Sequence, residues 1–184
     1  MRLVPPLPVC DDAEFSSDGA ERLWLSRKVA DTGPLGLIIG LNPSTAGATS
    51  ETDDPTIKRE KEFSRQWGWG GFWKGNLFTR IETYSQNLKN MTYRDACGMH
   101  GSDVLERMLP QASEIVVCWG AAVPKHMTHR ISAVCTYIRM LKQPDARVLC
   151  FGTTQKGHPT HPLYLSYDTP MVEFELPTER ASRR

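Results

Sequence analysis

Hydrophobic and polar positions follow one another along the chain in blocks that predict strands separated by helices. Four near-continuous apolar runs predict strands that are buried on both faces of a sheet. These runs cover residues 35–41, 72–78, 114–120 and 147–152. The looser alternation of residues 21–29 predicts an edge strand, and residues 171–176 predict a short final strand. Residues 1–20, which are rich in proline and small polar side chains, predict an extended lead-in.

Helices are predicted in the segments between these strands. Asp54 and Pro55 have the pattern of an N-cap followed by proline at the first helical position, which predicts a helix that ends near Trp67. Further helices are predicted at residues 101–109 and 121–141. The alternation predicts a single α/β domain over residues 21–177, a three-layer α/β/α sandwich around a mostly parallel sheet of about four or five strands. The polar residues 178–184 are predicted to be a flexible tail.

The composition narrows the function classes. The chain has 184 residues and a net charge of +1, so it lacks the strongly basic footprint of tight non-specific nucleic-acid binders. Its five cysteines include no Cys-x-x-Cys pair, and we predict neither a metal site nor a cofactor. The amino terminus is too short and too proline-rich for a signal peptide. No apolar run approaches the roughly 20 residues that span a bilayer, so we expect a soluble cytoplasmic protein without membrane contact.

Candidate ligand-binding groups follow several predicted strands, and ligands of parallel α/β sheets bind at the carboxyl ends of strands. Leu41-Asn42-Pro43-Ser44 ends the first apolar run and predicts the floor of a small-molecule or nucleobase pocket. Asn42 offers a donor and an acceptor that can orient a water or read a base edge, or can instead cap the local backbone. Asn76 ends the next strand and is expected to bind the ligand or to tie down a loop.

Four further residues are candidates for substrate binding. Trp69 and Phe78 offer flat faces for stacking on a base, and Trp69, between two glycines, is expected to be exposed. Core packing is the alternative for a tryptophan. Arg80 is expected to meet a phosphate or a carboxylate, or to form a surface ion pair. Gly120 ends another predicted strand and is expected beside the same pocket.

Two histidines and one aspartate add candidate catalytic groups to Asn42. His158 and His161 each precede a proline, in a loop that cannot be helical. A neutral imidazole can donate to a developing oxyanion or shuttle a proton. Metal binding, or an imidazole satisfied by backbone carbonyls, is the alternative. Asp53 is expected to act as a general base or to hold a ribose hydroxyl.

Several short motifs are spread over roughly residues 22–174. They are Asn42-Pro43-Ser44-Thr45-Ala46, Asp54-Pro55-Thr56-Ile57, Trp67-Gly68, Asn76-Leu77-Phe78, Gly157-His158-Pro159 and His161-Pro162-Leu163-Tyr164. Together they resemble an uncharacterised bacterial and phage family that is known only as a domain of unknown function. This resemblance implies no activity.

A more distant resemblance implies one. Gly40-Leu41-Asn42-Pro43 is similar to the first motif of the uracil-DNA glycosylase superfamily, and later features follow in a similar order. The resemblance implies that Asn42 positions the attacking water and that Asn76 reads the base. It also implies that the histidine of His158-Pro159-Thr160 stabilises the oxyanion of the base, although the second pair, His161-Pro162, leaves open which histidine corresponds. The implied fold is uracil-DNA-glycosylase-like.

From these features we predict a protein that cleaves the N-glycosidic bond of a standard or modified nucleobase in DNA or a nucleotide. The alternative is a module that binds a nucleobase, a nucleotide or modified DNA without cleaving it, in a phage or defence setting. A third class acts on a protein partner, which the sequence does not identify.

Overall fold

The computed structural model describes residues 10–98 and 100–177, and these contain a seven-stranded sheet in the order β1-β2-β4-β3-β5-β6-β7. The strands are β1 (Asp12–Phe15), β2 (Arg22–Lys28), β3 (Leu35–Gly40), β4 (Gly71–Asn76), β5 (Glu114–Val117), β6 (Arg147–Cys150) and β7 (Val172–Glu173). The four main predicted strands are confirmed with small shifts at their ends. The predicted tail and the first nine residues of the predicted lead-in lie outside the described residues.

The sheet is mixed, so the prediction of a mostly parallel sheet of about four or five strands is wrong. The central strands β4, β3, β5 and β6 run parallel, whereas β1-β2, β2-β4 and β6-β7 pair antiparallel. Parallel neighbours need a long crossover, usually a helix, and the chain supplies such helices only between β3 and β6. The predicted lead-in contains β1, which pairs with β2 and removes β2 from the edge.

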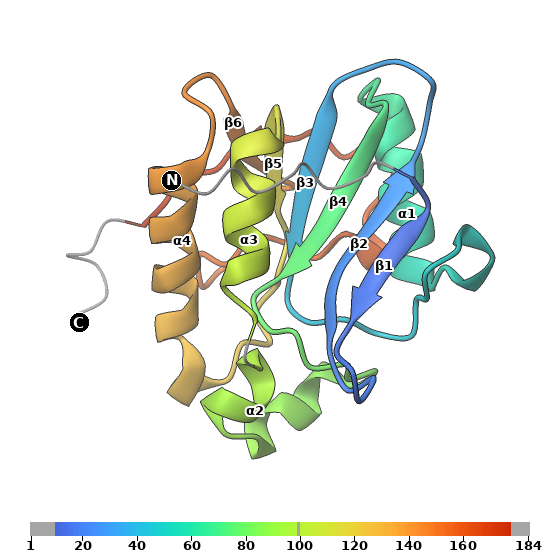
Figure 1. Ribbon diagram of the computed structural model, residues 1–184. Helices are drawn as coiled ribbons and strands as arrows, with labels where there is room; N and C mark the ends of the chain where they lie inside the picture. The colour runs from blue at the N-terminus through green and yellow to red at the C-terminus, as the bar shows by residue number, and fades with distance from the viewer. Residues whose placement is uncertain (1–9, 99, 178–184) are drawn as a thin grey trace.

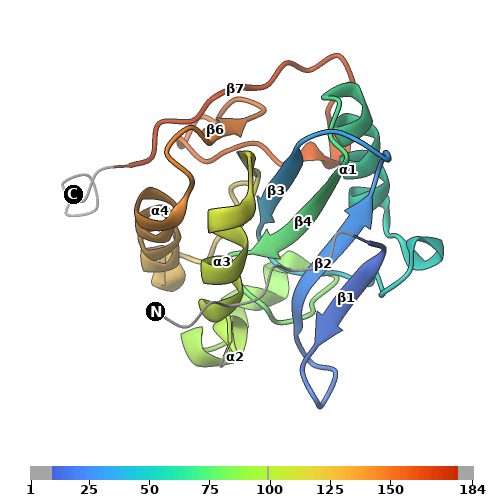
Figure 2. The same ribbon diagram turned by 45° about the horizontal axis from the view of Figure 1, so that its top comes forward.

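Helices cover the two faces of the sheet (Figures 1 and 2). They are α1 (Pro55–Gln66), α2 (Tyr93–Cys97), α3 (Asp103–Met108) and α4 (His129–Leu141). Asp54 caps α1 by accepting a hydrogen bond from the Ile57 N–H at 2.9 Å, as predicted. The predicted helix at 121–141 is shorter, because Pro124 has an extended ψ of 139° and α4 begins only at His129.

Alternation along the strands divides the core into two clusters. Leu37 and Ile39 pack with residues of α3 and α4 in what we call the α3-α4 cluster. Ile38 packs with residues of α1 on the other face, in what we call the α1 cluster. On β4, Phe72 packs with the α1 cluster. Because side chains two residues apart share a face, Lys74 and Asn76 lie on this α1 face as well. The α1 face is therefore apolar along most of its length and polar at the carboxyl end of β4.

The sheet order creates a topological switch point at β3. The crossover through α1 places β4 on one side of β3, and β5 then pairs with the other side. In sheets of this kind the crevice at the carboxyl ends of the diverging strands is the usual ligand site. Figure 1 shows the arrows of β3 and β4 pointing to the same end of the molecule.

A bulge in β2 changes which face Arg22 meets. Glu14 pairs with Trp24 and Phe15 with Arg22, so Leu23 is left without a partner in the ladder. Leu23 and Trp24 both pack into the α3-α4 cluster. The extra residue turns Arg22 to the α1 face, where Lys74 and Asn76 also lie.

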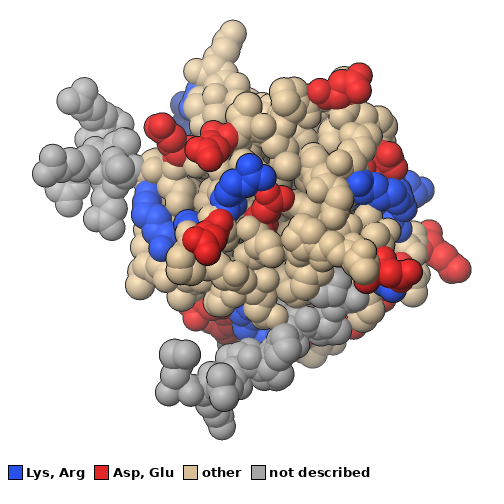
Figure 3. Space-filling view, turned by 90° about the horizontal axis from the view of Figure 1, so that it is seen from above, with Lys and Arg blue, Asp and Glu red and all other residues tan. Residues whose placement is uncertain are grey.

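The end of the molecule at the top of Figure 1 lies opposite the carboxyl ends of β3 and β4. Figure 3 shows that acidic and basic side chains are interspersed there among uncharged ones. Within residues 10–98 and 100–177 no helix is long and apolar enough to cross a membrane.

Candidate functional site

A pocket of about 590 Å³ opens at the carboxyl ends of β3, β4 and β5. This volume lies within the roughly 300–1,000 Å³ range of small-molecule sites. Its floor comes from Gly40, Lys74 and Asn76, and the start of α1 forms one wall. The other walls come from residues 41, 42, 44 and 45, from residues 82–86 and 119–122, and from residues 161, 163 and 164. The structure therefore brings Leu41, Asn42, Ser44, Asn76, Gly120 and His161 of the predicted site together.

Asn76 is the least satisfied polar residue of the floor. The residue is 5% exposed, and among the residues that the structure describes neither Oδ1 nor Nδ2 has a hydrogen-bond partner. A buried amide without partners loses about 1–3 kcal/mol relative to a satisfied one. A ligand that presents one donor and one acceptor side by side would satisfy both atoms.

Gly40 leaves the space that this floor needs. A Cβ at position 40 would lie 2.8 Å from Nζ of Lys74 and 3.0 Å from Oδ1 of Asn76. The first distance is too short for a real Cβ and the second is unusually tight, so a side chain here would push the ammonium of Lys74 aside and crowd the amide of Asn76. The glycine thus allows an ammonium and an amide to reach the bottom of the pocket together.

Charged groups around the floor are buried and only partly paired. Lys74 donates to Oε1 of Glu60 on α1, whereas Oε2 of Glu60 has no partner in residues 10–98 and 100–177. Burial raises the pKa of Glu60, and the ammonium of Lys74 opposes that rise. Arg22 donates to the Ala46 carbonyl at 2.9 Å, while its Nε has no partner among the same described residues. Burial lowers the pKa of Arg22 to about 10, with Asp54 and Glu60 opposing, so it stays charged at neutral pH.

Asn42 ties the pocket wall together through its nitrogen. Nδ2 donates to the carbonyl of Pro43 at 2.8 Å and to the carbonyl of Glu82 at 2.7 Å. These two acceptors identify the nitrogen of the amide, so Oδ1 is left to accept from a water or a ligand. Pro43 itself is buried beneath the turn and does not line the pocket.

His161 lines the pocket as a neutral imidazole. Burial lowers its pKa to about 4, and Lys74 adds to the effect while Asp54 opposes it. Nδ1 accepts a hydrogen bond from the backbone N–H of Leu163 at 3.3 Å. A neutral imidazole whose Nδ1 accepts carries its proton on Nε2. His161 therefore has a donor available at neutral pH.

His158 lies outside this pocket. The segment around His158 instead holds its loop against the residues that follow β5, because the carbonyl of Pro159 accepts a hydrogen bond from the N–H of Gly120 at 2.9 Å. The N–H of Thr160 donates to the carbonyl of Gly152 at 3.0 Å. The first His-Pro pair thus joins the loop to the sheet, and the second presents His161 to the cavity.

Asp53 is held away from the pocket by a buried ion pair. Its Oδ1 accepts from Nε of Arg27 at 2.7 Å, and its Oδ2 lies 3.2 Å from Nζ of Lys61. Arg27 also donates to the carbonyls of Gly47, Ala48 and Thr49. The pair fixes the loop that leads to α1, and the carboxylate of Asp53 has no access to a ligand in the pocket.

The aromatic residues are placed differently from the prediction. Trp69 is 1% exposed and packs into the α1 cluster, so the expectation of an exposed ring is wrong. The ring lies over Gly36 of β3, where a Cβ would be 2.0 Å from Cζ3 of Trp69. Its Nε1 donates to Glu114 at 2.7 Å. Phe78 is fully buried in the α3-α4 cluster and offers no face to a ligand.

Two tyrosines take the place that was predicted for Trp69. Tyr84 is 65% exposed and Tyr164 is 93% exposed, and both line the pocket. Tyr164 belongs to the predicted loop motif, and Tyr84 lies in a connection that carries no motif. Arg22, Lys74 and Glu60 were likewise missed. For Lys74 a signal was available in the sequence, because it is a charged residue within the otherwise apolar run that forms β4.

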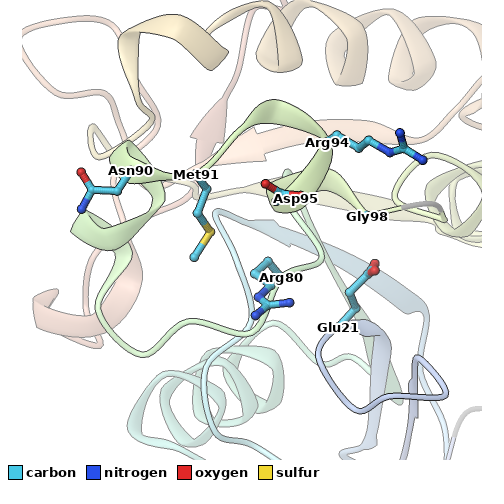
Figure 4. Close-up of a pocket in the computed structure, with 7 residues that line it drawn as sticks. All are labelled: Glu21, Arg80, Asn90, Met91, Arg94, Asp95 and Gly98. Carbon is cyan, nitrogen blue, oxygen red and sulfur yellow. The ribbon is translucent and has the colours of Figure 1, made fainter.

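Arg80 lies in a second hollow, not in the pocket. Figure 4 shows this hollow, which Glu21, Arg80, Asn90, Met91, Arg94, Asp95 and Gly98 line. In Figure 4 Asp95 lies above Arg80 and Glu21 lies to its right, while Arg94 extends away from Arg80. Acidic and basic groups balance in this hollow, which gives it no preference for an anion.

Thiol and metal chemistry find no support at the residues that the structure describes. Cys118 lies beside Lys74 and Glu60, but burial raises its pKa to about 12, so its thiol is not a nucleophile at neutral pH. Across residues 10–98 and 100–177 no group of three or more His, Cys, Asp or Glu side chains is placed to hold a metal ion.

Comparison with known proteins agrees with the motif series. A family model described as "Protein of unknown function (DUF1643)" matches residues 22–163. No curated protein and no solved structure gives a significant match to the chain. The family match confirms the resemblance to a domain of unknown function, and its range runs from Arg22 to Leu163, two residues that line the pocket. The chain belongs to the DUF1643 family of proteins of unknown function.

Proposed function

We propose that the protein holds a nucleobase in this pocket and hydrolyses the N-glycosidic bond that joins the base to its sugar. The observation that carries the proposal is the buried amide of Asn76, whose two polar atoms have no partner within the described part of the chain. A nucleobase edge presents adjacent donors and acceptors of the kind that an asparagine amide pairs with. The similarity of residues 40–43 to the first motif of the uracil-DNA glycosylase superfamily supports the same reading.

The polar groups of the pocket have different roles in the proposed reaction. Oδ1 of Asn42 accepts a hydrogen bond from a water and orients its oxygen toward the anomeric carbon. The new C–O bond forms as the C–N bond breaks, and the electron pair of the C–N bond leaves with the base. Nε2–H of His161 donates to the negative charge that develops on the base. The proton that the water loses then neutralises the base, so that free base and sugar are the products.

A second candidate function is binding without cleavage. It is favoured by the position of Asp53, which is paired with Arg27 and does not reach the pocket. Asn42 can orient a water but its amide does not take up a proton at neutral pH. A module that recognises a standard or modified base in a nucleotide or in DNA would use the same floor and would not need a general base.

One experiment separates these functions. Purified protein is incubated with nucleosides and with oligonucleotides that carry standard or modified bases, and free base is measured by chromatography alongside binding by calorimetry. For hydrolysis we expect base release that disappears in Asn42→Ala and His161→Ala, while Asn76→Ala loses both binding and release. The exposed residues Asn87 and His100, which do not line the pocket, give matched control variants Asn87→Ala and His100→Ala.

The outcomes are distinct. Binding that depends on Asn76 without any base release assigns the protein to the second function. Absence of both binding and release across the panel contradicts both functions.

A further inference from the structure

The mouth of the pocket carries two aromatic side chains that the floor does not need. Tyr84 and Tyr164 are 65% and 93% exposed, although each lines the cavity. They come from separate segments, one before α2 and one in the 3-10 turn Pro162–Tyr164. Exposed aromatic rings beside a groove are the usual platforms on which successive bases of a single strand stack.

The backbone beneath each ring is held in place. For Tyr84, Nδ2 of Asn42 donates to the Glu82 carbonyl, and the N–H of Glu82 donates to the Pro43 carbonyl at 2.9 Å. The N–H of Tyr84 itself donates to Oε1 of Glu82 at 3.1 Å. The rings therefore stand on an ordered backbone, which lowers the entropy that a stacking ligand must remove.

The turn that carries Tyr164 is fixed by α1. Nε of Arg59 donates to the Pro162 carbonyl at 3.2 Å, and Nη2 donates to the Leu165 carbonyl. The guanidinium of Arg59 also lies 4.3 Å from the ring centre of Tyr167. Pro162 is buried while Tyr164 projects outward. The same turn thus fixes the position of His161 in the pocket and of Tyr164 at its rim.

The charge of the chain indicates how a nucleic acid would be held. A duplex is bound mainly through its phosphates, and that requires a basic surface. The net charge here is +1. Stacking on neutral tyrosine rings uses the faces of unpaired bases and does not itself require a phosphate contact. Affinity should then depend weakly on salt.

We propose that the ligand is a single-stranded nucleic acid, whose central base enters the pocket while neighbouring bases stack on Tyr84 and Tyr164. This inference rests on the proposed function, because it takes the occupant of the pocket to be a nucleobase. It adds that the chain around that base is recognised, and that neither a free nucleoside nor a duplex is the preferred ligand.

The test measures binding of three probes that share one base. The probes are the free deoxynucleoside, a pentanucleotide with that base between thymidines, and the same pentanucleotide sequence within a duplex. The series is made with adenine, guanine, cytosine, thymine and uracil at the centre. We expect the pentanucleotide to bind more tightly than the nucleoside and the duplex, with an affinity that changes less than tenfold between 50 and 200 mM salt.

Variants of the two tyrosines make the test specific. Tyr84→Ala and Tyr164→Ala should each weaken pentanucleotide binding at least fivefold, and should weaken nucleoside binding by a smaller factor. Tyr84→Phe and Tyr164→Phe should keep the affinity, because stacking uses the ring and not the hydroxyl. Tyr93→Ala is the matched control, since Tyr93 is half-exposed and lies outside the pocket.

Three results overturn the inference while leaving the proposed function intact. They are equal affinity for nucleoside and pentanucleotide, tighter binding of the duplex, and alanine variants that bind the pentanucleotide like the wild type. The proposed function fails separately if Asn76→Ala leaves nucleoside binding unchanged. If no probe binds, both are overturned.

Discussion

Nδ2 of Asn42 donates a hydrogen bond to the backbone carbonyl of Glu82 at 2.7 Å and so joins the end of β3 to a segment 40 residues away. Asn42, which we propose to orient a water, therefore also has a structural role. Its nitrogen holds the wall of the pocket, and its oxygen is left for the ligand. Loss of activity in an Asn42 variant has two physical causes, and they can be separated.

Asn42→Asp keeps the shape of the side chain but replaces the donor with a carboxylate oxygen. That oxygen would face the carbonyls of Pro43 and Glu82, so we expect a loss of about 1–2 kcal/mol in the free energy of unfolding. Amide hydrogen exchange should accelerate at residues 82–86. Asn87→Asp, on an exposed turn, should leave exchange in this segment unchanged. Unchanged exchange in Asn42→Asp would show that the wall is held by other contacts.

The buried imidazole of His161 makes stability depend on pH. Its folded-state pKa is about 4, below the ordinary value of 6.5, because burial disfavours the charged form. Between these values the unfolded chain binds more protons than the folded one, so stability falls as pH falls from 6.5 toward 4. Between pH 7.5 and 4.5 this group should account for a loss of about 2–3 kcal/mol.

The measurement compares urea unfolding of wild type and His161→Gln at these two pH values. The variant should lose less stability on acidification than the wild type, by the amount that His161 contributes. The exposed His100 provides the control, and His100→Gln should lose as much stability as the wild type. Equal losses in wild type and His161→Gln would contradict a neutral buried imidazole.

Asn76 should be unfavourable for stability and essential for binding. Asn76→Leu removes two buried polar atoms that have no partner, so the free energy of unfolding should rise by about 1–2 kcal/mol. Binding to any nucleobase probe should be lost. Thermal unfolding and calorimetry measure the two effects, with Asn87→Leu as an exposed control. A marked loss of stability in Asn76→Leu would show that the amide serves the fold.

The pair of Lys74 and Glu60 should behave as a coupled buried unit. Lys74→Met leaves the carboxylate of Glu60 buried without its partner, and we expect a loss of about 3–5 kcal/mol at pH 7. Adding Glu60→Leu should restore most of that loss, because no unpaired charge remains. Urea unfolding of the two single variants and the double variant gives the coupling energy. Lys28→Met, which breaks an exposed ion pair with Asp31, should change stability little.

Local sequence patterns predicted the parts of the fold that local physics controls. The buried run at 35–41 became β3, and Asp54 with Pro55 began α1, because strand burial and helix capping depend on adjacent residues. The carboxyl ends of β3 and β4 then placed Asn42 and Asn76 at one pocket, which follows from parallel pairing.

The residues whose positions were not predicted are placed by contacts between segments that are distant in sequence. Trp69 lies between glycines, but its burial is decided by Gly36 on β3, which leaves room for the ring. Arg22 reaches the pocket only through the bulge at Leu23. Tyr84 lines the mouth because Asn42 holds its segment there. The hydrophobic periodicity of a short stretch of sequence carries no information on these long-range contacts.

The position of the His161 loop along the chain also determines when the pocket can form during protein synthesis. Ser44 and Asp54 line it from the first third of the chain, whereas His161 and Tyr164 close it from near the other end. During synthesis the amino-terminal part of a chain emerges from the ribosome first. A nascent chain that has reached β6 already has its central parallel strands, yet it lacks the imidazole and the outer tyrosine. The site is therefore completed only after β6 has been synthesised, when Arg59 of α1 can donate to the carbonyl of Pro162.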